Sequence, residues 1–367
     1  MVKSLLAPAK YYQGTAILSD AYRYVAHIGR NFVIIADEEV VKLISERINV
    51  GFKNAGSECR FMRFNGESTL KEVRRLASRV SNEEDCDGII GAGGGKTLDT
   101  AKLVGNMCGL PVVSVPTIAS NDSACSCMAS IYSESGSFQK IERVKENPEV
   151  VLVDTEIISK APVRFFVAGM GEAFSTYYSA RACYRSGVPN YTGGERTYTA
   201  LSISKTCRDV LLRYGRQALE DMKAQRISES IERIIEANIY LSGVGYENNG
   251  CAASHAIHNA LTIAVDPFGS MHGEGTAFGV LVQLIMEYYE AGQWDHDEWD
   301  CIINFYRDIG LPRNYTHLNI TEPDGAFLSR VAEAACRKNS NIHNMPFEVT
   351  EEKVYNALKK LRDMDID

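Results

Sequence analysis

The sequence predicts an α/β domain, in which helices flank a parallel β-sheet, followed by an all-helical domain. Three observations support this prediction. At 367 residues the chain exceeds what one ordinary core needs. Over roughly the first 110 residues, short apolar runs alternate with helical patterns, which is typical of parallel strands joined by crossover helices. From about residue 163 onward, long helical patterns dominate and strand patterns are nearly absent.

The strands of the first domain are marked by short apolar runs. FVIIAD (32–37) is a continuous run typical of a buried strand, and further strands are expected at CRFMRF (59–64), GIIGAG (88–93) and PVVSVP (111–116). Helical patterns follow the first three runs, and Ser68 is expected to cap the start of the second helix. The alternation therefore predicts strand, helix and strand units within one sheet.

The boundary between the domains is expected near SKAPV (159–163), where a proline interrupts the pattern. This places an α/β domain at 1–162 and a helical domain at 163–367. No repeat, low-complexity tract or flexible linker separates them. We therefore expect the two domains to pack face to face, with a binding cleft between them.

Composition and charge argue against several classes of function. Hydrophobic residues make up 45% of the chain and charged residues 23%, as in an ordinary globular protein. The net charge of −8, with acids and bases interleaved, argues against nucleic-acid or membrane-surface binding. Without a signal-peptide pattern or a long apolar run, we expect a cytoplasmic protein. The ten cysteines form no CxxC pair and are expected to be reduced thiols.

A glycine-rich stretch, GAGGGKTLDTAK (91–102), lies between a predicted strand and a predicted helix. At that position, backbone amides and the helix dipole can bind a diphosphate. The stretch is not a Walker A motif, since only three residues separate Gly91 from Gly95. Nor is it a standard Rossmann fingerprint, because Lys96 stands at the sixth position. The alternative is a tight turn in which the glycines serve geometry alone.

Asp37 ends the first predicted strand. An acid at this place can accept a hydrogen bond from a ribose hydroxyl and exclude a 2′-phosphate, which favours NAD over NADP. An aspartate after a strand is also a common turn residue, so the interpretation depends on the glycine loop.

Three of the seven histidines fall within residues 254–274. His255 and His258 are one helical turn apart, and His272 begins an HGE triplet. Imidazoles in this number could bind a metal ion, whereas an HxxH pair on a helix is also compatible with ordinary packing.

Several segments together resemble the iron-containing (group III) alcohol dehydrogenases, and within that family the glycerol dehydrogenases. They are GAGGGKTLDTAK, VPTIASNDSACS (115–126), RIIEANIYLSGVGYENNGCAASHAIHNALT (233–262), HGEGTAFG (272–279) and IHNMP (342–346). They span nearly the whole chain in the expected order. The resemblance implies a dinucleotide-binding α/β domain and an all-helical domain, the two-domain architecture also found in dehydroquinate synthase.

The resemblance also implies which residues bind the cofactor and the substrate. It assigns the diphosphate to Gly93, Gly94, Gly95, Lys96 and Thr97. It places Thr117, Ser120, Ser126, Met128 and Tyr132 around the nicotinamide and its ribose. Asp122 matches an acid that contacts the hydroxyl groups of the substrate.

The metal ligands implied by the resemblance are Glu172, His255 and His272. Glycerol dehydrogenases carry aspartate where this chain has Glu172, in GMGEA (169–173). Glutamate is also an oxygen donor, so Zn²⁺ or another divalent metal such as Fe²⁺ is expected. The resemblance places His258 near the substrate. It could relay a proton, or it could be a packed helix residue.

The implied activity is the reversible, NAD-dependent oxidation of glycerol or a similar vicinal diol, by metal-assisted hydride transfer to give dihydroxyacetone from glycerol. The resemblance further implies a homo-oligomer, often an octamer. Three alternatives remain. A related oxidoreductase could act on 2-hydroxy or 2-oxo acids, with Arg181 as a candidate carboxylate ligand. Relatives such as dehydroquinate synthase handle phosphorylated substrates, which require basic residues near the second histidine. The chain could also be a non-catalytic, NAD-binding homologue that has lost its chemistry through Glu172.

Overall fold

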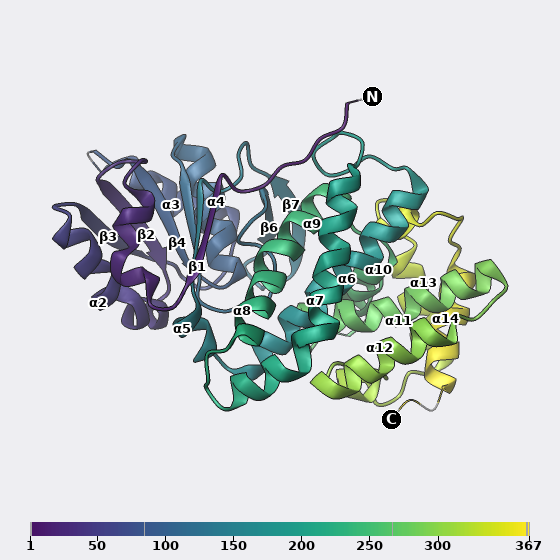
Figure 1. The fold of residues 1–367 in the computed structure, drawn as a ribbon. Helices are drawn as coiled ribbons and strands as arrows, with labels where there is room; N and C mark the ends of the chain where they lie inside the picture. Colours follow the sequence, from purple (N-terminus) through teal and green to yellow (C-terminus); the bar gives the residue numbers. More distant parts are fainter. Residues whose placement is uncertain (1, 84, 266, 365, 367) are drawn as a thin grey trace. The chain divides into compact units, whose positions relative to one another are not determined.

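The computed structural model describes residues 2–83, 85–265, 267–364 and 366. The chain forms two compact units, and neither is continuous in sequence. The first comprises Leu6–Pro162 and Asp221–Val244, and the second comprises Met1–Leu5, Val163–Glu220 and Gly245–Asp367. Figure 1 labels their elements along the chain. Residues 221–244 therefore belong to the same unit as the sheet, although helical sequence surrounds them.

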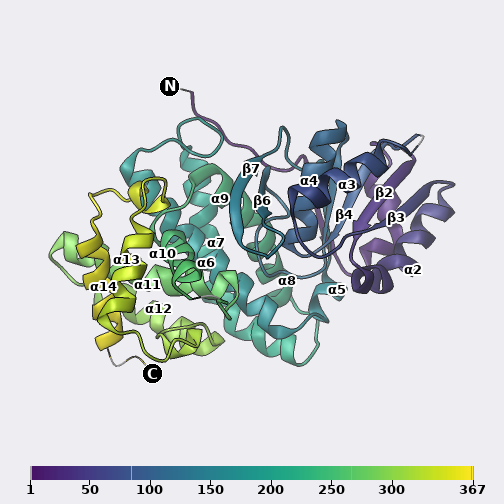
Figure 2. The same cartoon turned by 180° about the vertical axis from the view of Figure 1, so that it is seen from behind.

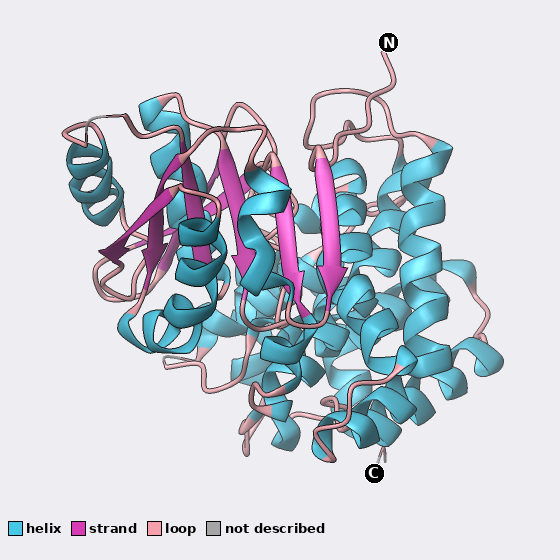
Figure 3. Ribbon diagram, turned by 60° about the vertical axis from the view of Figure 1, so that its left-hand side comes forward, coloured by secondary structure: helices cyan, strands magenta, loops and turns pink. Residues whose placement is uncertain are grey.

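The first unit is built on a six-stranded sheet. In spatial order its strands are β1 (Lys10–Gly14), β8 (Val150–Asp154), β5 (Val112–Pro116), β4 (Gly88–Gly93), β2 (Asn31–Ala36) and β3 (Glu58–Arg63). Each pair of neighbours is parallel. Figure 3 shows the strands as magenta arrows with cyan helices packed against them. The predicted parallel sheet is confirmed.

Both faces of this sheet are buried, which explains why its central strands are continuously apolar. Phe32 and Ile34 of β2 point into one core, which contains residues of α2 (Glu38–Asn54). Val33 and Ile35 point into a second core with residues of α3 (Leu70–Val80) and α4 (Gly95–Cys108). Successive side chains of a strand point to opposite faces, so one run of apolar residues contributes to both cores. The short helices η1 (Ile17–Asp20) and α1 (Ala21–Val25) cover the first face.

One local prediction for this unit is wrong. Ser68 does not cap the second helix, because Thr69 occupies the N-cap position of α3 and its hydroxyl accepts a hydrogen bond from the Glu72 amide at 3.1 Å. The hydroxyl of Ser68 instead donates to the carbonyl of Ser130 at 3.0 Å. The Ser68 side chain, which local spacing assigned to the helix, therefore binds a partner 62 residues further along the chain.

Some elements of the first unit were not predicted from the sequence. They include β1, β8 and an antiparallel hairpin of β6 (Met128–Tyr132) and β7 (Phe138–Arg143). Also unpredicted are α5 (Thr155–Ser159) and a π-helical turn, η2 (Ala237–Leu241), whereas α8 (Glu229–Glu236) lies in a stretch that the sequence predicted to be helical. The Val150–Asp154 run is as apolar and buried as β2, so periodicity could have identified β8.

The order of the strands creates a switch point in the connections of the sheet. From β2 the chain passes through α2 to β3 on one side, and from β4 it passes through α4 to β5 on the other. In open α/β sheets, ligands bind beyond the carboxyl ends of strands where the direction of connection reverses. Asp37 directly follows β2, and Gly94 directly follows β4. The two predicted cofactor elements therefore flank the switch point.

The second unit consists of helices, most of which are visible in the rear view of Figure 2. They are α6 (Val163–Ser186), α7 (Tyr198–Lys223), α9 (Ser242–Asn249), α10 (Ala253–Ala264), α11 (His272–Ala291), α12 (His296–Ile309), η3 (Thr316–Leu318), α13 (Gly325–Ala335), η4 (Asn341–Asn344) and α14 (Glu351–Asp363); the last residues of α7 and the first of α9 belong to the first unit. Helices α6, α10 and α11 pack against one another. No described helix combines the length and the hydropathy that a bilayer-spanning segment needs.

Candidate active site

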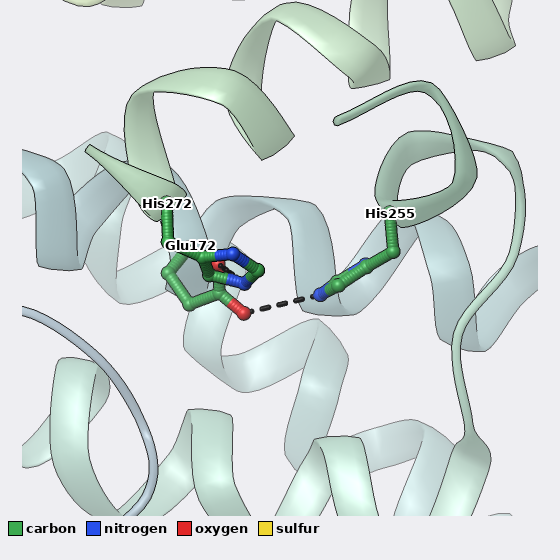
Figure 4. A group of neighbouring side chains, drawn as sticks. All are labelled: Glu172, His255 and His272. Atoms are coloured by element: carbon green, nitrogen blue, oxygen red, sulfur yellow. Dashed lines mark hydrogen bonds and ion pairs between the residues drawn. The ribbon is translucent and has the colours of Figure 1, made fainter. Parts of the chain in front are cut away.

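Three potential metal ligands from three helices meet in the second unit: Glu172 of α6, His255 of α10 and His272 of α11 (Figure 4). Their ligand atoms all lie within 4.8 Å of one another. Oε1 of Glu172 is 3.1 Å from Nε2 of His255, and Oε2 is 3.1 Å from Nε2 of His272. The structure thus brings together residues that are 83 and 100 positions apart in the chain, by subtraction of 172 from 255 and 272.

Glycines allow α6 and α11 to come close enough for this arrangement. A Cβ atom added to Gly273 would lie 1.8 Å from the carbonyl oxygen of Ala168 in α6. One added to Gly171, next to Glu172, would lie 2.4 Å from the carbonyl oxygen of Gly273. Both distances are far below van der Waals contact. Gly273, which follows His272, therefore permits the close packing of α6 and α11 that brings Glu172 and His272 together.

Hydroxyl groups surround the candidate ligands. Thr276 Oγ1, one turn after His272, donates to Oε2 of Glu172 at 2.9 Å. The hydroxyls of Ser254 and Ser179 lie 3.3 and 3.4 Å from Nδ1 of His255. Partners of this kind orient metal-ligating side chains and fix the imidazole tautomer. Sequence reasoning missed all three hydroxyls, although the helical spacing of Thr276 from His272 was a usable signal.

The carboxylate of Glu172 is held in its charged form. Burial raises its pKa and is the largest single effect, but His272 and His255 together outweigh it, so the pKa lies well below its ordinary value. The Glu172 side chain is 3% exposed and that of His272 is 47% exposed, so the centre is accessible on the His272 side. One carboxylate and two imidazoles are a donor set that suits Zn²⁺ or Fe²⁺. The residues present therefore fit a divalent metal.

Among the residues that the structure describes, His258 lies outside this group of ligand atoms. It is buried, and its ring meets the His272 ring edge-on, with centroids 4.4 Å apart. Burial, followed by the neighbouring His272, holds the pKa of His258 well below its ordinary value. A Cβ atom at Gly275 would lie 2.1 Å from Nδ1 of His258, so this glycine makes room for the ring. His258 thus packs against the ring of His272, one of the candidate metal ligands.

The predicted diphosphate loop adopts a conformation suited to backbone binding. Gly93 ends β4 with a φ of +148°, which side chains rarely tolerate, and Gly94 is the N-cap of α4. A Cβ atom on Gly93 would lie 2.8 Å from the hydroxyl of Thr97. The amide of Thr117 donates to the carbonyl of Gly93 at 3.1 Å, which joins the next predicted segment to the loop. The amino end of α4 is therefore left as a site for an anion.

Several of the residues assigned to the nicotinamide and its ribose lie close to this loop. Lys96 forms an ion pair with Glu67 at 2.6 Å, and its ammonium group lies 4.9 Å from the centroid of the Tyr132 ring. Burial raises the pKa of Tyr132 to about 12, so its hydroxyl stays protonated. Ser120 is half-buried and accepts a hydrogen bond from Asn121, whose side chain faces Gly95.

Ser126 and Met128 are held by a lysine that sequence reasoning did not identify. The side chain of Lys102 is 1% exposed and lies 2.9 Å from Asp99. Its ammonium group donates to the carbonyls of Ser123, Ser126 and Met128. A buried lysine needs such partners to remain charged. Its place in GGGKTLDTAK, two turns into α4, gave no sign of this role.

Asp37 is the N-cap of α2 and accepts a hydrogen bond from the Val40 amide at 2.9 Å. Asp37 thus has a local structural role, as a helix cap and not as the turn residue that the sequence allowed, at a place that also suits ribose binding. Asp122 is buried, and the hydroxyl of Ser242 donates to its Oδ2 at 3.2 Å. Both carboxylates belong to the same unit as the glycine loop.

Known proteins resemble this chain over nearly its whole length. Residues 15–162 match the family model for iron-containing alcohol dehydrogenase. Glycerol dehydrogenase of Citrobacter freundii is 40% identical over 98% of this chain and 96% of its own length. The crystal structure of glycerol dehydrogenase from Schizosaccharomyces pombe is similar, with a TM-score of 0.93 and 32% identity, over 98% of this chain and 90% of that chain. The chain belongs to the iron-containing alcohol dehydrogenase family.

Members of the iron-containing alcohol dehydrogenase family that resemble this chain carry more than one substrate name. Glycolaldehyde reductase of Halobacterium salinarum is 36% identical over 99% of this chain and 98% of its own length. Membership in the family therefore establishes the class of oxidoreductase but does not by itself determine the substrate.

Two arginines bear on the choice of substrate within this family. Arg181 of α6 pairs with Glu287 at 2.7 Å and with Glu298 at 2.5 Å. Arg164 donates two hydrogen bonds to Glu274, each 2.8 Å long, close to His272. Both guanidinium groups are thus already neutralised by carboxylates of the same unit.

Proposed function

We propose that this protein oxidises glycerol, or a similar vicinal diol, with NAD as the hydride acceptor. The group of Glu172, His255 and His272 carries the proposal, because one carboxylate and two imidazoles, with only His272 exposed, are a donor set that suits a catalytic metal. The relatives named glycerol dehydrogenase, which align over nearly the whole chain, support the choice of substrate.

A divalent ion such as Zn²⁺ or Fe²⁺, held by Glu172, His255 and His272, would polarise the hydroxyl group that is oxidised and lower its pKa. The three side chains come from separate helices, so packing of the helices sets their spacing. Thr276 would keep the Glu172 carboxylate in a single orientation through its 2.9 Å hydrogen bond.

The cofactor would be held by the first unit. The amides at the start of α4, from Gly93 to Thr97, would bind the diphosphate, and Asp37 would accept a hydrogen bond from the ribose and repel a 2′-phosphate. Thr117, Ser120, Ser126, Met128 and Tyr132 are proposed to line the nicotinamide and its ribose.

The substrate would be oriented by Asp122, whose carboxylate can accept a hydrogen bond from a hydroxyl group. Hydride then passes from the carbinol carbon to C4 of the nicotinamide, and the hydroxyl proton leaves, so that glycerol gives dihydroxyacetone, NADH and H⁺. The reaction is reversible.

The alternative substrates require positive charge that is already neutralised. A 2-hydroxy or 2-oxo acid would need an arginine or lysine for its carboxylate, but Arg181 is bound by two glutamates. A phosphorylated substrate would need bases near the second histidine, where Arg164 is paired with Glu274. A neutral polyol needs neither. A non-catalytic, NAD-binding homologue would bind the nucleotide without turnover.

The proposal includes three further expectations from the sequence. They are a homo-oligomer, a cytoplasmic location, and the assignment of NAD binding to 1–162 and of metal and substrate binding to 163–367. Size-exclusion chromatography with light scattering tests the first of these directly.

The experiment that tests the proposal is a substrate panel followed by NADH absorbance. Purified protein loaded with Zn²⁺ or Fe²⁺ is assayed with NAD and NADP against glycerol, 1,2-propanediol, 2-propanol and lactate. Turnover of glycerol and of 1,2-propanediol with NAD is expected to exceed that of lactate. Faster oxidation of lactate than of either diol would overturn the choice of substrate, and nucleotide binding without any turnover would support the non-catalytic alternative.

A further inference from the structure

A π-helical turn interrupts the helix that runs from Glu229 to Asn249. It spans Ala237–Leu241, and the amide of Ser242 bonds to the carbonyl of Ala237, five residues earlier. Turns of this kind are rare and occur frequently at functional sites. This one lies in residues 221–244, the helical segment that belongs to the unit with the sheet.

The π turn and the residues after it contact the segment that contains Asp122. The side chain of Asn238 donates to the carbonyl of Ala119 at 3.0 Å, and the hydroxyl of Ser242 donates to Oδ2 of Asp122 at 3.2 Å. Asn238 and Ser242 are both fully buried. The helix therefore contacts this segment at two points, the backbone of Ala119 and the carboxylate of Asp122.

The backbone of the two segments also approaches closely at Gly243. A Cβ atom there would lie 2.8 Å from the carbonyl oxygen of Asp122 and 2.9 Å from Cβ of Cys125. Only glycine leaves the helix this close to the loop. The contact therefore combines two features: Gly243 permits the close backbone approach, and the hydroxyl of Ser242 binds the Asp122 carboxylate.

We propose that Ser242 is a positioning residue, which fixes the orientation of the Asp122 carboxylate for the hydroxyl groups of the substrate. This inference rests on the proposed function, in which Asp122 binds a diol. Loss of the Ser242 hydrogen bond removes one of the contacts that hold the carboxylate in its present orientation. Displacements well under 1 Å matter for substrate orientation, so loss of one buried donor lowers the efficiency with diols.

The test is a double-mutant cycle on the metal-loaded protein. Ser242→Ala is expected to lower kcat/KM for glycerol by about 10- to 100-fold, the range for loss of a hydrogen bond to a charged group. In an Asp122→Ala background the same change is expected to cost less than about 2-fold, because Ser242 acts through Asp122. Ser242→Thr, which keeps the hydroxyl, should restore much of the loss.

Two controls separate positioning from a loss of folding. Ser230→Ala changes a half-buried serine of the preceding helix, α8, and should leave kcat/KM unchanged. For Ser242→Ala, the affinity for NADH, the metal content and the melting temperature are expected to stay close to wild type. Equal losses in the wild-type and Asp122→Ala backgrounds, or an equal loss with 2-propanol, would overturn the inference.

A crystal structure of Ser242→Ala keeps the inference separate from the proposed function. Rotation of the Asp122 carboxylate would support positioning, and an unchanged carboxylate would overturn it. If the wild-type protein oxidises no diol, the proposed function fails, and this structure still decides whether Ser242 orients the acid.

Discussion

Replacing Gly273 by alanine tests whether the close approach of α6 and α11 builds the candidate metal centre. The added Cβ atom would lie 1.8 Å from the carbonyl oxygen of Ala168 and 3.0 Å from the amide nitrogen of Glu172. Ordinary contact between such atoms is no closer than about 3.4 Å, so the helices must separate by an amount on the order of 1 Å. The carboxylate of Glu172 and the imidazole of His272 would then lie too far apart for their present 3.1 Å contact.

Gly273→Ala has two opposing effects on the free energy of unfolding, and their magnitudes decide whether the protein is stabilised or destabilised. Alanine favours a helix over glycine by up to about 1 kcal/mol. Overpacking a close contact costs typically about 1–3 kcal/mol, and more against backbone atoms that cannot turn away. We therefore expect the free energy of unfolding to fall by about 1–2 kcal/mol, with a loss of metal affinity on the order of 10-fold or more.

The assays for Gly273→Ala are urea unfolding of the metal-free protein and calorimetric titration with Zn²⁺. Gly325→Ala is the matched control, because Gly325 also lies in the first turn of a helix but its added Cβ would meet only the Tyr355 hydroxyl, at 3.4 Å. The control should be neutral or stabilising. If Gly273→Ala is as stable as wild type and binds Zn²⁺ equally well, the reasoning from helix contact is refuted.

Three further changes test individual contacts. Thr276→Val should weaken Zn²⁺ binding by about 10- to 100-fold, as for other residues that orient a ligand, while Thr276→Ser keeps it; equal affinities would contradict this role. Glu67→Gln should tighten NADH binding by up to about 5-fold, because Lys96 is released from a half-exposed ion pair worth at most about 1 kcal/mol; weaker binding by fluorescence titration would contradict it. Lys102→Met should lower the free energy of unfolding by about 3–5 kcal/mol, since the buried Asp99 loses its counter-charge. Wild-type stability in denaturant unfolding would refute this.

The strands of the sheet could be predicted where burial leaves a local signature. FVIIAD and GIIGAG are continuously apolar because both faces of β2 and β4 are covered. The cap of α3 could not be decided in this way, since Ser68 and Thr69 are both good caps and only the distant carbonyl of Ser130 determines which hydroxyl remains for the helix.

In the candidate site, too, local sequence predicts some features and not others. The ligand types in the HGE and HxxH segments suggested a metal, and the resemblance selected Glu172, His255 and His272, which the structure places together. Thr276 was signalled by its helical spacing from His272. The buried Lys102 and the contact of Ser242 with Asp122 had no local sign. Each depends on how segments distant in sequence pack, which periodicity and spacing do not encode.

The most direct test of metal-dependent glycerol oxidation is a titration of chelator-treated protein with Zn²⁺, followed by the initial rate of NADH formation from glycerol and NAD. The rate is expected to rise from near zero and to level off at one ion per chain, and Glu172→Gln, which keeps the size of the side chain but removes its charge, should show almost no rise. Full activity without metal, or a Glu172→Gln variant that responds to Zn²⁺ as wild type does, would contradict the proposed site.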